Sequence, residues 1–317
     1  MAEQIAVVGG GSIGVAWALS FARAGFDVAV HDPDPQRREA VRHELRDRLD
    51  DLASFDLIDE PCETIAARVT AHDDLAPAVA GRSYVQECAP ESLDLKRDLF
   101  ARLDVATRPD AVLASSSSAL PCSAFAGELP GRERCLVAHP GNPPYLLPVV
   151  ELVPAPFTRR DVVEQAEQLL GRAGLRVVHV RKEVKGFVFN RLQGALLREA
   201  YCLVRDGVAS VDDVDRVVRD GLGRRWSFIG QFETVDLNTS GGIEAHAARM
   251  GPAYEPMGAE RGQHDPWTPE LVQQVTAERR ELLALERWDE RVAWRDRMLM
   301  ALERARRDGS GAGAKRP

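Results

Sequence analysis

The sequence lacks the features that would place the protein in a membrane or on nucleic acid. No apolar run approaches the ~18 residues of a transmembrane helix, and the apolar stretch at the N-terminus is too short for a signal peptide. Lys and Arg number 41 against 49 Asp and Glu, so the net charge is −8 and no basic binding surface is expected. The composition predicts a soluble cytoplasmic protein.

Cysteine is scarce and irregularly spaced. The sequence contains no CxxC pair, and its five cysteines are Cys62, Cys88, Cys122, Cys135 and Cys202. An odd, scattered set is typical of reduced thiols in a cytoplasm rather than of a disulfide framework or a zinc site. We therefore expect no metal, and a chain of 317 residues can bury a large core without staples.

Strand signals occur only in the first 180 residues. The β-branched runs are IAVVG, DVAVHD, SYVQEC, AVLASS, CLVAH, VVELV and LRVVHV. Helix-period stretches between them cover 34–53, 92–106 and 158–173. Strands alternating with helices predict βαβ units and an α/β fold, a Rossmann-type doubly wound and mostly parallel sheet.

The remainder of the chain has a helical pattern. A helical stretch covers 186–206 and ends at Gly207, and Ser210 is an N-cap candidate for the helix that follows it. A long charged helical pattern occupies 268–305, whereas the Gly- and Pro-rich stretch 239–267 predicts a loop.

These patterns define the domain organisation. We place an α/β domain at 1–184 and an all-helical C-terminal domain at 185–308. The Gly-rich end, 309–317, is expected to be a disordered tail.

A dinucleotide fingerprint follows the first strand signal. Gly9, Gly11 and Gly14 have GxGxxG spacing, and the next strand ends on Asp32. The first glycine permits a tight turn, the second lets the backbone approach a pyrophosphate, and the third lets helix pack on strand. An acid such as Asp32 can accept both ribose hydroxyls and would repel a 2′-phosphate, which favours NAD over NADP. FAD shares the fingerprint but usually needs further motifs that we do not find.

Four further stretches occur in order after this fingerprint: ASSSSAL (114–120), AHPGN (138–142), VVELV (149–153) and GFVFNRL (186–192). Each alone has a structural explanation, such as a solvated serine turn, a satisfied histidine at a strand end or a paired surface acid. Together, behind a dinucleotide fold, they form a candidate catalytic set.

With these motifs the sequence resembles the 3-hydroxyacyl-CoA dehydrogenase superfamily, and within it the lambda-crystallin / L-gulonate 3-dehydrogenase branch. The resemblance covers nearly the whole chain and includes QECAPESLDLKRDLF, HPGNPPYLLPVVELVP and GLGRRWSFIGQFETVDLN. It implies an NAD-dependent oxidoreductase that forms a homodimer through its helical domain. The catalytic residues implied by the resemblance are Ser118, His139, Glu151 and Asn190. The cofactor contacts implied by it are Ser12, Ile13, Asp32, Glu91, Lys96 and Asn142.

The chemistry of alcohol oxidation suits these residue types. Oxidation removes a hydroxyl proton and passes a hydride to the nicotinamide, and a histidine with a pKa of ~6.5 can accept that proton. In this scheme His139 is the general base and Glu151 orients its ring, as in other histidine–acid pairs. Ser118 and Asn190 would hydrogen-bond the substrate oxygen.

The sequence departs from the family pattern in places that bear on the substrate. The run SSSS leaves Ser117 as an alternative to Ser118. The segment 47–63, where the acyl-CoA enzymes bind part of CoA, is acidic here and would repel a CoA diphosphate. A small acid needs a cation, for which Arg224 and Arg225 are candidates and Arg225 is preferred.

Three functions remain open at this point. The preferred one is oxidation of the 3-hydroxyl of a small hydroxy acid, with L-gulonate, giving 3-dehydro-L-gulonate, as the best single candidate. The second is a 3-hydroxybutyryl-CoA or other 3-hydroxyacyl-CoA dehydrogenase. The third is a non-catalytic, crystallin-like NAD-binding protein, against which the complete set of four catalytic residues argues.

Overall fold

The computed structural model describes residues 3–262, 268–292, 294, 298 and 305. The chain divides into two compact units, residues 1–198 and a second unit that begins at Glu199. The expected disordered tail, 309–317, lies outside the described residues. Over the described ranges, no helix is long and apolar enough to cross a membrane.

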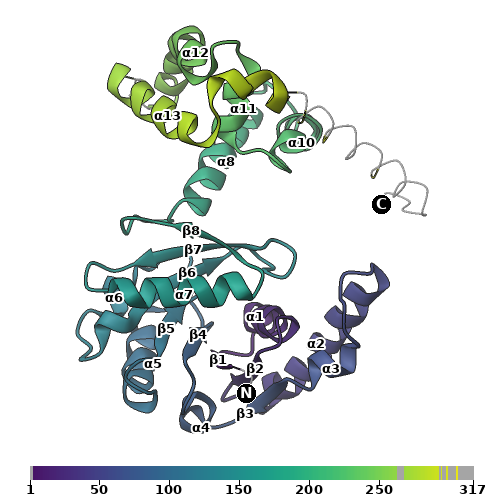
Figure 1. Cartoon of the computed structure of the whole chain (residues 1–317), viewed down its shortest axis with the longest axis vertical. Helices are drawn as coiled ribbons and strands as arrows, with labels where there is room; N and C mark the ends of the chain where they lie inside the picture. Colours follow the sequence, from purple (N-terminus) through teal and green to yellow (C-terminus); the bar gives the residue numbers. More distant parts are fainter. Residues whose placement is uncertain (1–2, 263–267, 293, 295–297, 299–304, 306–317) are drawn as a thin grey trace. The chain divides into compact units, whose positions relative to one another are not determined.

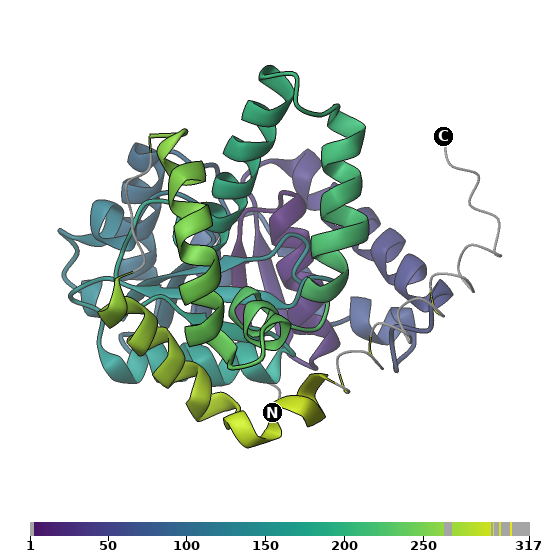
Figure 2. The same cartoon turned by 90° about the horizontal axis from the view of Figure 1, so that it is seen from above.

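One sheet of eight strands forms the centre of the first unit (Figures 1 and 2). The strand order is β3-β2-β1-β4-β5-β6-β7-β8, and all neighbours are parallel except β6 and β7. The strands are β1 (Gln4–Val8), β2 (Asp27–His31), β3 (Val69–His72), β4 (Tyr84–Glu87), β5 (Val112–Ser115), β6 (Cys135–Pro140), β7 (Val149–Pro154) and β8 (Arg176–His179). The doubly wound, mostly parallel sheet is confirmed.

Helices cover both faces of this sheet, because alternate strand residues are apolar on each face. Val7, Val28 and Leu152 pack beneath α1, α2 and α7, whereas Ala6, Val85 and Val153 pack beneath α4, α5 and α6. The helices are α1 (Ser12–Arg23), α2 (Pro35–Ser54), α3 (Cys62–Ala66), α4 (Leu75–Val79), α5 (Leu93–Ala106), α6 (Cys122–Ala126), the short 3₁₀ helix η1 (Arg132–Arg134) and α7 (Arg160–Arg172). The helical stretches 34–53, 92–106 and 158–173 match α2, α5 and α7 to within two residues.

The sequence patterns miss strand β3. Its residues, VTAH, lie at the edge of the sheet and are only partly buried, so the strand has no clear apolar run. Pairing with β2, in which Val69 lies beside Val28, stabilises it as a strand. Local composition alone does not reveal such an edge strand.

The strand order reverses direction between β1 and β4. In doubly wound sheets, ligands bind outside the carboxyl ends of the strands at this switch point. The loop that begins at Gly9 follows β1, and the segment that begins at Cys88 follows β4, so both lie at this edge. The chain topology therefore brings the glycine fingerprint to the expected ligand edge.

The second unit contains helices joined by turns over its described residues, and it is drawn in green and yellow-green in Figures 1 and 2. The helix α8 (Phe189–Arg205) leads into it and ends, as predicted, before Gly207, whose φ is +69°. Ser210 caps the next helix through a bond from the Asp213 amide. The remaining segments are α9 (Val211–Arg216), the π-helical η2 (Val217–Leu222), α10 (Gly223–Trp226), α11 (Gln231–Asn238), α12 (Gly242–Ala259), α13 (Pro269–Leu282) and η3 (Leu285–Arg287).

The predicted loop at 239–267 is wrong over most of its length. It contains α12, in which Pro252 and Pro256 lie four residues apart and are exposed. Each proline removes one backbone hydrogen bond, but water can satisfy a carbonyl freed on an exposed face. Packing of Ile243 and its neighbours against α11 and α13 outweighs the proline cost.

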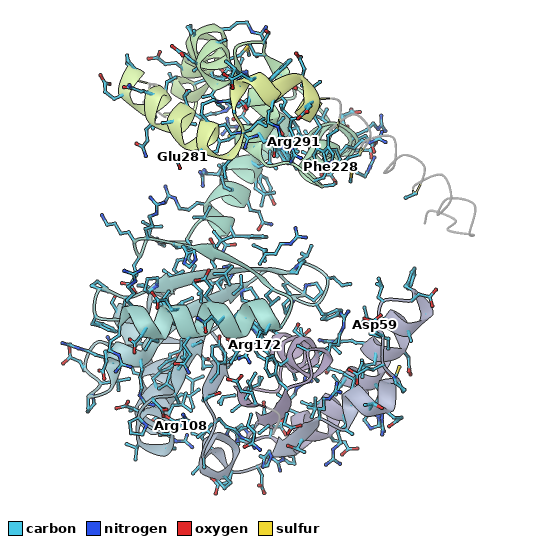
Figure 3. The ribbon with its side chains drawn as sticks, in the orientation of Figure 1. Asp59, Arg108, Arg172, Phe228, Glu281 and Arg291 are labelled. Atoms are coloured by element: carbon cyan, nitrogen blue, oxygen red, sulfur yellow. The ribbon has the colours of Figure 1, made fainter. Side chains whose placement is uncertain are left out.

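The helical pattern predicted over 268–305 is interrupted within its described residues, and residues 293, 295–297 and 299–304 of it lie outside them. The helix α13 ends at Leu282, and Leu283 is extended with φ −148°. The break lets Trp288 donate to the Asp236 carbonyl at 2.7 Å and Arg291 bond Glu233 at 2.7 Å. Arg291 and Phe228, both labelled in Figure 3, each contact the Trp294 ring, at 3.6 and 5.9 Å from its centroid. Tertiary bonds therefore interrupt a segment whose composition favours helix.

Candidate active site

The glycine loop shows which of its glycines the fold requires. Gly9 has φ +107°, and a Cβ there would lie 2.8 Å from the backbone carbonyl of Cys88. A Cβ on Gly14 would lie 1.9 Å from the Gly9 oxygen. Packing of helix on strand therefore excludes any side chain at these two positions.

Gly11 is different, because nothing in the fold itself requires a glycine there. Its φ is −66°, and a Cβ would meet no atom within 4 Å. Ser12 and Ile13 then open α1, so the space beside Gly11 adjoins a helix N-terminus with unsatisfied amides. A side chain would fill this space, whereas a pyrophosphate that approaches the backbone fits it.

Asp32 lies where the ribose contact is expected, directly after β2. Its Oδ2 accepts from the Gly10 amide at 2.7 Å, and its Oδ1 accepts from the Asp34 amide at 2.9 Å. These two bonds orient the carboxylate beside the glycine loop. The residues present therefore fit a dinucleotide with a free 2′-hydroxyl.

Lys96 is held by an acid that sequence reasoning missed. Its Nζ lies 2.9 and 2.8 Å from the two carboxylate oxygens of Glu87 and 3.7 Å from Glu91. Lys96 and Glu87 are 1% and 0% exposed. Glu87 also accepts from the Ser115 hydroxyl at 2.5 Å and from the Ala89 amide at 2.7 Å. An acid at the end of the apolar run YVQE was the available signal, since buried acids need partners.

Ser117 braces the turn that follows β5. Its hydroxyl lies 2.5 Å from Glu91 Oε1 and accepts from the Leu120 amide at 2.8 Å, and it is 1% exposed. Glu91 Oε1 also accepts from the amides of Ala119 and Leu120. Ser117 is thus committed to the turn, and Ser118 is the half-buried serine beside it.

Antiparallel pairing brings His139 and Glu151 together. The two residues are register partners on β6 and β7. His139 Nδ1 lies 2.7 Å from Glu151 Oε2, and both residues are buried. The other oxygen, Oε1, accepts from the amides of Val188 at 2.7 Å and Phe189 at 2.9 Å. The start of α8 therefore fixes the carboxylate that holds the histidine.

Backbone geometry before α8 makes this contact possible. Gly186 and Phe187 both have positive φ, +79° and +48°. This turn aims the first amides of α8 at Glu151 and buries Phe187 against the His139 ring, at a centroid distance of 5.8 Å. Phe189 contacts the ring edge-on at 6.2 Å. The ring of His139 is thus held by packing as well as by hydrogen bonding.

Asn190 completes the cluster in the first unit. Its Nδ2 donates to the Ser118 carbonyl at 3.1 Å. The structure therefore brings together Ser118, His139, Glu151 and Asn190, four residues spread over 73 positions of the sequence. Backbone or side-chain bonds connect the turn after β5, the β6–β7 pair and the start of α8.

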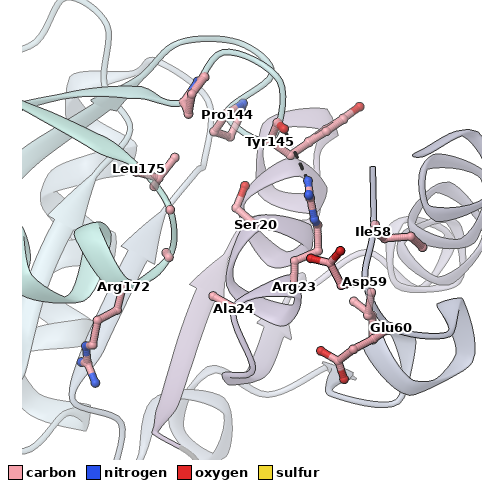
Figure 4. A pocket seen from close by; sticks show the side chains of 14 residues that line it. Ser20, Arg23, Ala24, Ile58, Asp59, Glu60, Pro144, Tyr145, Arg172 and Leu175 are labelled. Atoms are coloured by element: carbon pink, nitrogen blue, oxygen red, sulfur yellow. Dashed lines mark hydrogen bonds between the residues drawn. The ribbon is translucent and has the colours of Figure 1, made fainter. Parts of the chain in front are cut away.

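The β6–β7 loop carries Asn142, which is exposed. Arg23 of α1 contacts this loop, because its guanidinium donates to the Tyr145 carbonyl at 3.5 Å (Figure 4). It also donates to the carbonyl of Leu57, in the segment after α2, at 2.7 Å. Arg23 and Tyr145 line a pocket of about 320 Å³ that also includes the end of α7. By strand alternation His139 faces the opposite side of the sheet, so this pocket supports the loop from the α1 and α7 side.

Arg224 and Arg225 belong to the second unit, on α10. Arg225 Nη1 donates to Asn238 at 3.4 Å. Contact of either arginine with a substrate carboxylate stays a prediction.

The acids of the site are expected to make stability depend on pH. Burial raises the pKa of the Glu151 carboxyl, but bonds from His139, Phe189 and Val188 outweigh burial and leave the pKa below its ordinary value. The pKa of Glu91 is likewise lowered, since bonds from Ser117, Leu120 and Ala119 outweigh burial. The folded protein therefore binds fewer protons than the unfolded chain. The stabilisation is complete above the ordinary carboxyl pKa and is lost as pH falls through the lowered values.

We expect the melting temperature to fall as pH drops below about 5, and Glu91→Gln to flatten this fall. Glu128→Gln removes an exposed carboxyl and serves as the control, with the wild-type pH dependence. Thermal melts at a series of acid pH values provide the measurement. The same slope in wild type and Glu91→Gln would contradict the assignment.

A Rossmann-type sheet with a dinucleotide loop, and a histidine–glutamate pair in the same unit, define the class of NAD-dependent dehydrogenases that act on hydroxyl groups. Residues 4–184 match the family model described as 3-hydroxyacyl-CoA dehydrogenase, NAD binding domain, and residues 186–281 match the C-terminal domain of the same family. The chain belongs to the 3-hydroxyacyl-CoA dehydrogenase family, and NAD is its cofactor.

Known proteins are similar in sequence to this chain over most of its length. It is 40% identical to the lambda-crystallin homolog of Bos taurus over 315 residues, which cover 94% of each chain. It is 39% identical to the L-carnitine dehydrogenase of Pseudomonas aeruginosa over 86% of this chain and 82% of that one. A solved structure, the NAD⁺-dependent dismutase 5-formyl-3-hydroxy-2-methylpyridine 4-carboxylic acid 5-dehydrogenase, aligns with a TM-score of 0.71, 28% identity, and coverage of 90% and 98%.

Proposed function

We propose that the protein oxidises the 3-hydroxyl of a small hydroxy acid, with L-gulonate as the first candidate and 3-dehydro-L-gulonate as its product. The observation that carries the proposal is the buried His139–Glu151 pair, at 2.7 Å, in the same unit as the NAD fingerprint. A histidine held in this way can exchange a proton with a hydroxyl group.

The contact between His139 and Glu151 indicates which ring nitrogen of His139 accepts the proton of the substrate hydroxyl. Because Glu151 is ionised and contacts Nδ1, that nitrogen carries the hydrogen and Nε2 is the base. Nε2 takes the hydroxyl proton while NAD supplies the hydride acceptor. The imidazolium that results is stabilised by Glu151, which cannot rotate away because Val188 and Phe189 hold its second oxygen.

Ser118 and Asn190 are proposed to hydrogen-bond the reacting oxygen. Ser117 is occupied in its turn, which favours Ser118 over its neighbour. The Asn190 side chain donates to the Ser118 carbonyl, so it is held against the same backbone from which the Ser118 hydroxyl extends. Donors fixed in advance need little reorganisation as charge develops on the oxygen.

The proposed substrate is a small acid rather than a CoA thioester. Apart from Arg48, every charged residue of the segment 47–63 is acidic, and these acids would repel the diphosphate of CoA. Arg225, with Arg224, is the proposed partner of the substrate carboxylate. The second candidate is L-carnitine, because a relative of 39% identity is an L-carnitine dehydrogenase and L-carnitine is also a 3-hydroxy acid.

A substrate panel monitored by NADH absorbance tests the proposal. L-gulonate, L-carnitine, 3-hydroxybutyrate and 3-hydroxybutyryl-CoA are compared by kcat/KM, and we expect L-gulonate to rank first. A higher kcat/KM for the thioester would establish the acyl-CoA alternative instead. No turnover of any compound, with NADH still bound, would leave the crystallin-like function.

We also propose a homodimer in the cytoplasm, and domains at 1–184 and 185–308. In the sequence, the boundary between the two family models falls between residues 184 and 186, whereas the boundary between the two compact units falls between residues 198 and 199. The difference has a physical cause, since the first residues of α8 bond Glu151 and Ser118 of the first unit.

A further inference from the structure

Helix α2 places two arginines against the glycine loop. Arg37, Glu44 and Arg48 are separated by seven and four residues, which puts them on one side of the helix. Glu44 joins the other two, at 3.0 Å from Arg37 and 3.2 Å from Arg48. Each arginine also reaches backbone at the proposed pyrophosphate position.

The contacts of Arg48 are directed at the first residue of α1. Its Nη1 donates to the Ser12 carbonyl at 3.0 Å, and its Nη2 donates to the Ser12 hydroxyl at 3.0 Å. Arg37 donates to the Gly10 carbonyl through Nη2 at 2.5 Å and Nε at 3.2 Å. The two guanidinium groups thus bond Gly10 and Ser12, the residues before and after Gly11, and a Cβ added to Gly11 would meet no atom within 4 Å.

Charge and donor count favour an anion beside this group. Two arginines against one carboxylate leave the trio with one net positive charge next to the N-terminus of α1. The side chain of Arg48 is only 18% exposed, so its field is less screened than that of a solvated charge. A guanidinium has five N–H donors, more than Ser12 and Glu44 take up.

We propose that Arg48 is a cofactor-binding residue that pairs with the NAD pyrophosphate, and that Glu44 and Arg37 position it. The main-chain amides of the glycine loop and the side chain of Arg48 then share the phosphate charge. The inference goes beyond the proposed function, because it holds for any hydroxy acid that the enzyme oxidises. A merely structural role, in which Arg48 ties α2 to α1, is the competing explanation.

Binding of three ligands that differ in their phosphate groups separates the cofactor-binding role of Arg48 from a structural role. Fluorescence titration gives the Kd of NADH, and competition against NADH gives those of ADP and adenosine. We expect Arg48→Gln to weaken NADH and ADP about 10- to 100-fold, the range for hydrogen bonds to charged groups. Adenosine, which has no phosphate, should bind the variant within about two-fold of wild type.

Two variants control for charge and folding. Arg42→Gln removes the same charge from an exposed position of α2 and should leave all three Kd values unchanged. Arg48→Lys keeps the charge without the planar fork and should recover part of the affinity. Rising NaCl should weaken NADH binding to wild type more steeply than to Arg48→Gln.

Two results would overturn the assignment. One is an unchanged Kd for NADH and ADP in Arg48→Gln. The other is an equal loss for adenosine and ADP, which would show that Arg48 only holds α2 in place. Because every readout is binding, failure of the substrate panel would not affect this outcome.

Discussion

Replacing His139 by Gln is expected to lower kcat by about 10²- to 10⁴-fold, the usual contribution of a general base. Glutamine can hydrogen-bond Glu151 but cannot accept the hydroxyl proton at neutral pH. The Kd of NADH should stay unchanged, since His139 contacts Glu151, Phe187 and Phe189 rather than the glycine loop. Steady-state kinetics with the best substrate of the panel and NADH titration provide the two measurements.

A surface pair in the same unit offers a matched control. His179 lies 3.1 Å from Glu167, and both side chains are about half exposed. His179→Gln should therefore leave kcat unchanged. Activity of His139→Gln within a few-fold of wild type would remove His139 as the base, even if the protein folded normally and bound NADH.

Lys96→Met is expected to destabilise the protein by about 3–5 kcal/mol, the cost of leaving a buried partner charge unpaired. The Glu87 carboxylate would keep its bonds from Ser115 and Ala89 but would lose its counter-ion in a site that is 0% exposed. Urea unfolding, followed by circular dichroism, measures the free energy of unfolding. A loss of this size would be among the largest single-residue effects.

The control for this prediction is Lys182→Met, because Lys182 is exposed, and surface changes usually stay within about 0.5 kcal/mol. Combining Lys96→Met with Glu87→Gln should be less destabilising than Lys96→Met alone, since the uncompensated charge is removed. Additive losses would contradict a coupled pair. NADH titration of the variants, while folded, shows separately whether Lys96 also contacts the cofactor.

Much of the fold followed from local patterns. Seven strands and the helices α2, α5 and α7 were predictable because their apolar residues repeat with the period of a strand or a helix. The edge strand β3 was not, since partial burial leaves no such repeat. The proline-containing helix α12 and the break at Leu283 were also missed, because packing and the bonds of Trp288 and Arg291 decide them.

In the candidate site, too, the sequence predicts some features and tertiary contacts decide the others. Gly9, Gly14 and Asp32 could be recognised because the fingerprint is contiguous and each position has one steric or charge requirement. His139 and Glu151 could be proposed as a pair, and antiparallel register then placed them 2.7 Å apart.

Residue types and spacing therefore predicted the cofactor class, and the resemblance to the dehydrogenase family predicted the four candidate catalytic residues. The partner of each buried charge depended on which strand ends and helix starts meet in three dimensions. Four contacts show this, and each joins different elements or segments far apart in the chain. Lys96 pairs with Glu87, the Ser117 turn is held by Glu91, Glu151 is bonded by the amides at the start of α8, and Arg48 is bonded to Ser12. A sequence shows that a buried charge needs a partner, but the folded backbone selects which group lies within hydrogen-bond distance.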